Sequence, residues 1–270
     1  MRIDLTGKPI VITGAGTGIG RATALACARA GMPIVLGGRR LDKLQQVQQE
    51  IESTGGKAHA VQMDVTSTDD CDRCVQETIE TFGSIYAVYA NAGYGIEKSI
   101  VDTSDADFRA IFETNFWGTM HIMRPALAHM LKQRTGHVLL CSSAIGKIGV
   151  PYYGAYCATK AAQSIVGRAM RHELRSSGVH VTTVHPVLTK TDFAVVAQQL
   201  SNVDSRKADQ MPNSLKQSPE RIANATVRAL HSPRTEVWTS LPTRWLFGLF
   251  NASPRIADIA LDRFAMPKKK

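Results

Sequence analysis

The sequence lacks any uninterrupted apolar run near the roughly 20 residues that a membrane span needs. It also lacks an apolar stretch ahead of the first expected strand, and Arg2 and Asp4 place charge among its first residues, so we expect no secretion signal. Cysteine is scarce and odd in number, at positions 27, 71, 74, 141 and 157. Together these absences favour a reduced, cytoplasmic protein.

Metal-site and nucleic-acid patterns are missing as well. Cys71 and Cys74 form a lone Cys-x-x-Cys pair in a polar helical stretch, where neither a redox pair nor a zinc site is expected. The eight histidines show no metal-ligand spacing, and the net charge of +9 comes without a zinc-finger, RNA-recognition or basic-aromatic pattern. We therefore expect no metal and no nucleic acid, and we attribute the charge to solubility and a phosphate-rich cofactor.

The arrangement of apolar residues predicts the fold class. The 270 residues, 44% of them hydrophobic, are enough for one large core, and we expect a single domain over residues 1–270. Short apolar strands alternate with helical patterns, which predicts an α/β fold: a doubly wound parallel sheet of about seven strands with helices on both faces. The expected strands are 10–13, 33–37, 57–62, 85–90, 136–141, 180–185 and 235–239. The expected helices are 19–30, 41–53, 69–82, 105–133 and 153–176, and Ser218-Pro219 begins another.

A glycine-rich turn, Gly14-Ala15-Gly16-Thr17-Gly18-Ile19-Gly20, follows the first expected strand and opens the first expected helix. In that context, backbone amides and the helix dipole hold a pyrophosphate. The spacing of the glycines differs from the commoner Gly-x-Gly-x-x-Gly, and a turn that only packs helix on sheet stays an alternative. The residues expected to bind the cofactor here are Gly14, Thr17, Gly18, Ile19 and Gly20.

An acidic residue is absent at the end of the second strand, about 20 residues after the turn, where the chain reads Gly37-Gly38-Arg39-Arg40. An Asp or Glu there accepts from the adenosine ribose and repels a 2′-phosphate, whereas Arg39 pairs with that phosphate. The sequence therefore predicts NADP(H) rather than NAD(H), bound with Arg39 and Arg40. The alternative is that both arginines are solvated charges at a helix start, and equal binding of NADH and NADPH would support it.

Tyr156 and Lys160 form a proton-transfer pair. They are four residues apart in an alanine-rich stretch without proline, 153–176, so they share a face of the expected helix. A second Tyr-x-x-x-Lys at Tyr94 and Lys98 lies in a glycine-flanked stretch where no long helix is expected, and we interpret it as accidental.

Six ordered signals resemble the short-chain dehydrogenase/reductase family in its ordinary single-domain form, over nearly all of residues 1–239. They are the glycine turn, Asp64-Val65 after the third strand, Asn91-Ala92-Gly93 after the fourth, Asn115 in the long helix, Ser142-Ser143 ending the fifth, and Tyr156 with Lys160. The resemblance implies an open seven-stranded Rossmann sheet, usually assembled into homodimers or homotetramers through the long helices.

The resemblance also implies roles at the matching positions. Tyr156 resembles the catalytic acid/base, Lys160 its partner, Ser143 the ligand of the substrate carbonyl, and Asn115 the holder of a proton-relay water. A tyrosine with a pKa of about 10 is a weak base at neutral pH, so alcohol oxidation needs a cation that stabilises the phenolate. In reduction, the phenol gives its proton to the carbonyl oxygen that Ser143 holds. Ser143 is preferred to Ser142 because the family places the serine thirteen residues before the tyrosine.

Further cofactor contacts are implied in the same way. Asp64 and Val65 resemble the adenine contacts, and Asn91, with Ala92 and Gly93, ties the fourth strand to the cofactor. After the sixth strand the family's Pro-Gly is replaced by Pro186-Val187, and valine lacks the freedom of glycine to adopt a positive φ. The remaining expected contacts are Tyr156, Lys160, Pro186, Leu188 and Thr191, the last matching the family's carboxamide-binding threonine.

The connection 187–217 is long and contains a helical piece, 193–200, so we expect it to cover the nicotinamide as a lid. The residues expected to line the pocket are Tyr94, Ile145, Tyr153, Leu188 and Phe193. They favour an apolar carbonyl or alcohol over a phosphorylated sugar, although each is equally suited to core packing.

Residues 241–270 form an amphipathic extension with interleaved basic residues. Its apolar faces comprise Trp245, Leu246, Leu249 and Phe250, then Ile256, Ile259, Ala260 and Phe264. We favour packing on the substrate lobe or on a neighbouring subunit, and contact with anionic lipid is the alternative.

Three hypotheses for the function follow. The leading one is an NADP(H)-dependent oxidoreductase that interconverts an apolar ketone or aldehyde and its alcohol. The second is a peripheral-membrane reductase of lipid-like carbonyls, and the third is a non-catalytic NADP(H)-binding regulatory protein. The complete set of Asn115, Ser143, Tyr156 and Lys160 argues against the third, because a binding module needs no proton donor.

Overall fold

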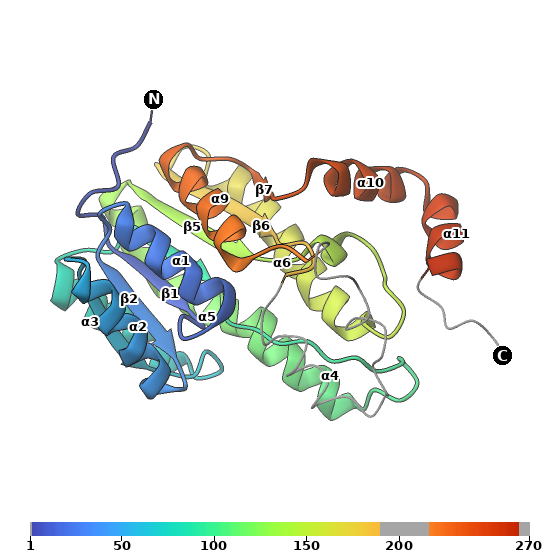
Figure 1. Ribbon diagram of the computed structural model, residues 1–270, viewed down its shortest axis with the longest axis horizontal. Coiled ribbons are helices and arrows are strands. Elements are labelled where there is room, and N and C mark those ends of the chain that lie inside the picture. The colour runs from blue at the N-terminus through green and yellow to red at the C-terminus, as the bar shows by residue number, and fades with distance from the viewer. Residues whose placement is uncertain (1, 190–215, 265–270) are drawn as a thin grey trace.

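Seven parallel strands form one sheet in the part of the chain that the structure describes, residues 2–189 and 216–264 of a computed structural model (Figure 1). The strands lie in the order β3-β2-β1-β4-β5-β6-β7. Their bounds are β1 (Ile10–Thr13), β2 (Ile34–Gly38), β3 (Ala58–Gln62), β4 (Ala87–Ala90), β5 (Gly136–Cys141), β6 (Val179–His185) and β7 (Glu236–Trp238). The chain winds outward from β1 to β3 and then returns to β4 on the other side of β1, which confirms the predicted doubly wound fold.

Helices cover both faces of the sheet. Their bounds are α1 (Gly18–Arg29), α2 (Leu41–Ser53), α3 (Thr68–Phe82), α4 (Asp105–Phe112), α5 (Gly118–Gln133), α6 (Gly154–Glu173), α9 (Pro219–His231), α10 (Leu241–Ala252) and α11 (Pro254–Phe264). Strand side chains alternate between the faces: Ile10 and Ile12 pack in a core with α1, α2 and α9, whereas Val11 packs in a core with α3, α5 and α6. In Figure 1, α1 and α9 lie next to each other on the near face.

Helix starts follow the capping residues of the sequence. Ser218 accepts a hydrogen bond from the backbone N–H of Arg221, and Pro219 is the first helical residue of α9, so the predicted start is confirmed. Ser104 caps α4 in the same way, through the N–H of Asp107. The ends are less well predicted, because the last turn of a helix depends on packing: α6 ends at Glu173 rather than at residue 176.

The long helix expected over 105–133 is interrupted. A π-helical turn, η1 (Glu113–Trp117), separates α4 from α5 and contains Asn115, which is fully buried. Asn115 bonds the main chain of Tyr94 through both side-chain atoms, accepting from its N–H at 3.0 Å and donating to its carbonyl at 2.9 Å. We attribute the widened turn to these contacts, since π turns recur where a helix must direct one side chain into a site.

The cysteine pair lies in the core. Cys71 and Cys74 are buried in α3, and all five cysteines are free. Burial raises the pKa of both Cys71 and Cys74 to about 12, so neither is a thiolate at neutral pH. The two cysteines are therefore part of the packed core, which agrees with the expectation that they form neither a redox pair nor a zinc site.

The chain leaves β6 through Pro186 and Val187 in an ordinary conformation. Among the described residues, only Arg134 and Tyr152 are non-glycine residues with a positive φ, so Val187 has no need of glycine's freedom. The expected lid helix 193–200, with Phe193 and Thr191, lies outside the described residues.

The C-terminal helices α10 and α11 extend beside the sheet at its β7 side (Figure 1). No residue of α10 is buried, and Leu241, Trp245 and Leu249, spaced by four, are exposed by 62%, 77% and 48%. The opposite side of α10 packs inward, where Phe247 lies 6.5 Å from the ring of Trp238 in β7.

Candidate active site

The glycine turn lies at the carboxyl end of β1. Gly14 has a φ of +66° and Gly18 a φ of +55°, the left-handed region that favours glycine. Thr17, the N-cap residue of α1, is extended, and its side chain makes no cap hydrogen bond. The first N–H groups of α1 therefore lack a capping side chain, which is the arrangement that binds a phosphate at a helix N-terminus.

Gly20 leaves no room for a side chain. A Cβ there would lie 2.2 Å from the carbonyl oxygen of Gly14 and 2.7 Å from Nδ2 of Asn91. We expect Gly20→Ala to destabilise the protein by about 1–3 kcal/mol, because main chain must move, and to lower Tm measurably in scanning calorimetry. In the control, Gly248→Ala, the added Cβ meets nothing within 4 Å and Tm should not fall. An equal Tm for the two variants would contradict this packing.

The end of β4 is joined to the glycine turn. Thr13 Oγ1 accepts from the backbone N–H groups of Asn91 and Ala92, both at 3.0 Å, and Asn91 Nδ2 donates to the Thr13 carbonyl at 2.9 Å. Gly93 lies against the inner site, because a Cβ there would be 2.8 Å from Oδ1 of Asn115 and 3.5 Å from Nζ of Lys160. The Asn91-Ala92-Gly93 segment thus links the turn to the Tyr156 region.

Two arginines follow β2 at the same edge of the sheet. Nη2 of Arg40 donates to Oγ1 of Thr17 at 3.3 Å, which brings its guanidinium to the glycine turn. Nη1 of Arg39 lies 4.0 Å from Oδ2 of Asp64, and the Arg39 side chain is 80% exposed. An ion pair this long and exposed is weak, so Arg39 is available to an anionic ligand. Val65, next to Asp64, is buried against α5.

Tyr156 lies in the first turn of α6 and is buried except for 8% of its surface. Burial raises the pKa of Tyr156 above its usual value, and a side-chain hydrogen bond with Ser143 partly offsets that rise. The phenol is therefore protonated at neutral pH and is able to donate its proton. Ser143 follows β5 in an extended conformation and begins a short 3₁₀ turn, η2 (Ala144–Lys147).

Lys160 places a buried cation beside the tyrosine. Its Nζ lies 5.6 Å from the centroid of the Tyr156 ring, and it donates to the carbonyl of Cys141 at 2.7 Å and to Oε1 of Gln163 at 3.0 Å. Burial lowers the pKa of Lys160 from its usual value. The i, i+4 spacing thus brings the two heads together on one face of α6, as the sequence predicts.

Gln163 is a site residue that the sequence analysis missed. It is fully buried, and its Nε2 donates to the carbonyl of Asn115 and to Oγ1 of Thr119, both at 2.7 Å. These donations fix the amide so that Oε1 faces the ammonium of Lys160. Gln163 therefore lies between Asn115 and Lys160, where the resemblance implied a relay water. Its position three residues after Lys160, on the same helical face, is the signal that marks it.

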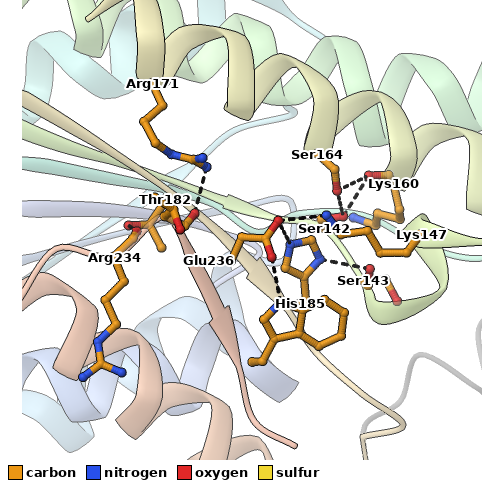
Figure 2. Close-up of polar contacts among 12 residues, drawn as sticks. Ser142, Ser143, Lys147, Lys160, Ser164, Arg171, Thr182, His185, Arg234 and Glu236 are labelled. Atoms are coloured by element: carbon orange, nitrogen blue, oxygen red, sulfur yellow. Dashed lines mark hydrogen bonds and ion pairs between the residues drawn. The ribbon is translucent and has the colours of Figure 1, made fainter. Parts of the chain in front are cut away.

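Ser142 and Ser143 have different surroundings (Figure 2). Ser142 is buried, and its hydroxyl bonds the carbonyl of Lys160 and the hydroxyl of Ser164, both at 2.8 Å. These contacts join β5 to α6 and leave Ser142 a packing role. The Ser143 side chain instead acts on Tyr156, because burial raises the pKa of the phenol and Ser143 lowers it in part.

The expected pocket residues are divided between two environments. Tyr94 and Ile145 pack with Tyr156 in a small apolar cluster that also contains Ile96 and Ile111. The Tyr153 hydroxyl donates to Oε2 of Glu97 at 2.9 Å, so the surroundings of the pocket include a carboxylate that the sequence analysis did not anticipate. Leu188 is 38% exposed, next to the undescribed segment.

The described residues show no cluster of three or more His, Cys, Asp or Glu side chains placed to hold a metal ion. None of the helices in the described ranges is long and apolar enough to cross a membrane.

The comparisons with known proteins agree in one family. The family profile described as short chain dehydrogenase matches residues 8–201. The ketoacyl reductase HetN of Nostoc sp. is 31% identical over 261 residues, which cover 96% of this chain and 88% of that protein.

Two solved structures resemble the chain. A short-chain dehydrogenase/reductase from Burkholderia phymatum in complex with NAD has a TM-score of 0.84 over 99% of both chains, and at 24% identity it supports the fold alone. An alcohol dehydrogenase from the archaeon Thermococcus sibiricus, complexed with 5-hydroxy-NADP, is 28% identical with a TM-score of 0.73, over 85% of this chain and 94% of that one. With the family profile matched from β1 past β6 and the Ser143, Tyr156 and Lys160 side chains assembled at one edge of the sheet, the chain belongs to the short-chain dehydrogenase family.

Proposed function

We propose that the protein is an NADP(H)-dependent oxidoreductase that interconverts an apolar ketone or aldehyde and the corresponding alcohol. The observation that carries this proposal is the buried Tyr156 side chain, whose ring lies 5.6 Å from Nζ of the buried Lys160 and whose pKa, raised by burial, is lowered in part by the neighbouring Ser143 side chain. A protonated phenol next to a hydroxyl and a cation is suited to proton transfer at a carbonyl oxygen.

The residues present fit a nicotinamide dinucleotide. The glycine turn offers uncapped N–H groups at the start of α1, which suit the binding of a pyrophosphate. When bound, the cofactor supplies or accepts the hydride. The residues that would hold it are Gly14, Thr17, Gly18, Ile19, Gly20, Arg39, Arg40, Asp64, Val65, Asn91, Ala92, Gly93, Pro186 and Leu188.

The protein's own groups manage the proton. Ser143 holds the substrate oxygen and Tyr156 donates to it in the reductive direction, for which the raised pKa of the phenol keeps the proton in place. Lys160 favours the phenolate that remains, because its ammonium lies over the ring. In the oxidative direction Tyr156 must lose its proton first, so we expect the oxidation rate to rise with pH and the reduction rate to hold from neutral pH upward.

Preference for NADP(H) is part of the proposal. Arg39 is exposed and Arg40 reaches Thr17 of the glycine turn, and guanidinium groups near this turn support pairing with an adenosine 2′-phosphate. Oδ1 of Asp64 accepts a hydrogen bond from the backbone N–H of Thr66, and its Oδ2 lies 4.0 Å from Nη1 of Arg39.

The function is tested by following NADPH oxidation at neutral pH against a panel of soluble and lipid-like carbonyls. We expect turnover with apolar ketones or aldehydes and little with phosphorylated sugars. Tight NADPH binding without turnover of any compound would favour the hypothesis of a non-catalytic regulatory protein. Turnover confined to lipid-like carbonyls presented in vesicles would favour the peripheral-membrane reading.

The exposed face of α10 is proposed as a contact between subunits. Leu241, Trp245 and Leu249 make an exposed apolar stripe along one side of α10, and contiguous exposed apolar side chains are typical of interaction surfaces. We expect a homodimer or homotetramer in light scattering, and Trp245→Glu should shift it toward monomer. Asn251→Glu, at an exposed position on another side of α10, is the control and should leave the oligomer intact.

The lipid alternative predicts a different pair of results. A monomeric wild-type protein that floats with anionic vesicles, and that loses flotation in Trp245→Glu, would contradict the subunit contact.

A further inference from the structure

A polar network lies between the Ser143 turn and strands β6 and β7 (Figure 2). His185 ends β6 and is fully buried. Its Nδ1 lies 3.2 Å from the main-chain carbonyl oxygen of Ser143. Because a carbonyl oxygen only accepts, Nδ1 is the donor in this contact. The imidazole therefore holds the main chain of Ser143, the residue whose side chain partly offsets the rise that burial causes in the pKa of Tyr156.

Glu236 and Trp238 hold the imidazole in turn. The ring of His185 stacks on Trp238, with centroids 4.6 Å apart and planes 19° apart. Oε1 of Glu236 lies 3.6 Å from Nε2 of His185, which is too long for a hydrogen bond. Oε2 of Glu236 accepts from the indole N–H of Trp238 at 2.9 Å. One face of the imidazole is thus held by Trp238 of β7, and its Nε2 edge faces the carboxylate of Glu236.

The same carboxylate ties down the far end of the η2 turn. Nζ of Lys147, the last residue of η2, donates to Oε1 of Glu236 at 2.8 Å. The N–H of Ala144, the first residue of η2, donates to the carbonyl of Pro186 at 3.0 Å. Interactions with His185, followed by those with Lys147 and Trp238, lower the pKa of Glu236 well below its usual range, so the carboxylate stays charged. Both ends of the turn after Ser143 are therefore anchored, one to Pro186 just after β6 and the other to Glu236 of β7.

We propose that His185 and Glu236 are positioning residues that fix the Ser143 hydroxyl through its main chain and the η2 turn. A polar pair at this depth carries a desolvation cost, which is offset where the pair orients a site. The inference rests on the proposed function, since it takes Ser143 to hold the substrate oxygen.

The test compares His185→Leu, which removes the donor, with His185→Asn, which keeps an N–H near the position of Nδ1. We expect His185→Leu to lower kcat by about tenfold or more with NADPH affinity unchanged, because a small displacement of a reacting group is costly. His185→Asn should recover most of kcat. The control is His137→Leu: His137 is another fully buried histidine, in β5, and its Nε2 bonds Thr182 at 2.8 Å. We expect His137→Leu to have the wild-type kcat per folded molecule.

A double-mutant cycle with Ser143→Ala separates positioning from general damage. If His185 acts through Ser143, the double variant Ser143→Ala/His185→Leu has the kcat of Ser143→Ala alone. The inference would be overturned if the decreases in kcat of the two single variants multiply in the double variant. It would also be overturned if His185→Leu is as active as His137→Leu. Full activity in Ser143→Ala would instead contradict the role of Ser143 in the proposed function, so the two failures are distinguishable.

Two further variants keep the test decisive if His185→Leu does not fold. Glu236→Gln and Lys147→Met alter side chains that are each 21% exposed, where a change of charge is better tolerated. Both should lower kcat with unchanged NADPH affinity, and both effects should vanish in the Ser143→Ala background. Unchanged kcat in both variants would overturn the inference.

Discussion

Replacing Tyr156 with phenylalanine is expected to lower kcat by about 100- to 10,000-fold, the usual size of a general acid–base contribution. The substitution removes only the hydroxyl, and the ring keeps its apolar packing against Ile96 and Ile111. NADPH affinity should therefore stay within about twofold of the wild type, because the phenol is expected to act on the substrate oxygen. Steady-state kinetics and a direct binding titration measure the two quantities.

Tyr89→Phe is the matched control for that substitution. Tyr89 is a fully buried tyrosine in β4, and losing its hydroxyl should leave kcat unchanged. If Tyr156→Phe turns over as fast as Tyr89→Phe, Tyr156 is not the proton donor, and another group must transfer the proton.

Replacing Arg39 with aspartate is expected to reverse the cofactor preference, with a change of about 100-fold in the ratio of kcat/KM for NADPH to that for NADH. The exposed guanidinium has only a 4.0 Å contact with Asp64 to lose, so the fold should be unaffected. A carboxylate at this position repels a 2′-phosphate and accepts from a ribose hydroxyl. KM should rise for NADPH and fall for NADH, while kcat with saturating cofactor changes little.

Arg175→Asp makes the same change of charge at an exposed site after α6, near the amino end of β6, and should leave the cofactor ratio unchanged. If Arg39→Asp also leaves the ratio unchanged, the arginines are solvated charges and the NADP(H) preference is wrong.

Much of the fold follows from local patterns. Alternating apolar strands and helices predict the parallel sheet, and Ser218-Pro219 marks the start of α9, because both features depend on residues close in the sequence. The pairing of Tyr156 with Lys160 is equally local, since a spacing of four residues places both on one face of α6.

The features that escaped prediction depend on contacts between distant segments. The π turn around Asn115 reflects hydrogen bonds to Tyr94, and the orientation of Gln163 depends on Asn115 and Thr119 from another helix. His185 meets Ser143 only because β6 lies beside β5 in the sheet. The pattern of apolar residues along the sequence does not show contacts between distant segments. The only local sign of them is a polar residue at a position of a helix or strand that is expected to be buried.

Hydride transfer between NADPH and an apolar carbonyl is tested most directly by tracing the transferred hydride. Wild-type protein is incubated with an apolar ketone and NADPH deuterated at one or the other C4 position, and the alcohol product is analysed by mass spectrometry. We predict deuterium at the carbinol carbon from one of the two labelled cofactors, and loss of that product in Tyr156→Phe. Product without deuterium from either cofactor, or labelled product formed at the wild-type rate by Tyr156→Phe, would contradict this prediction.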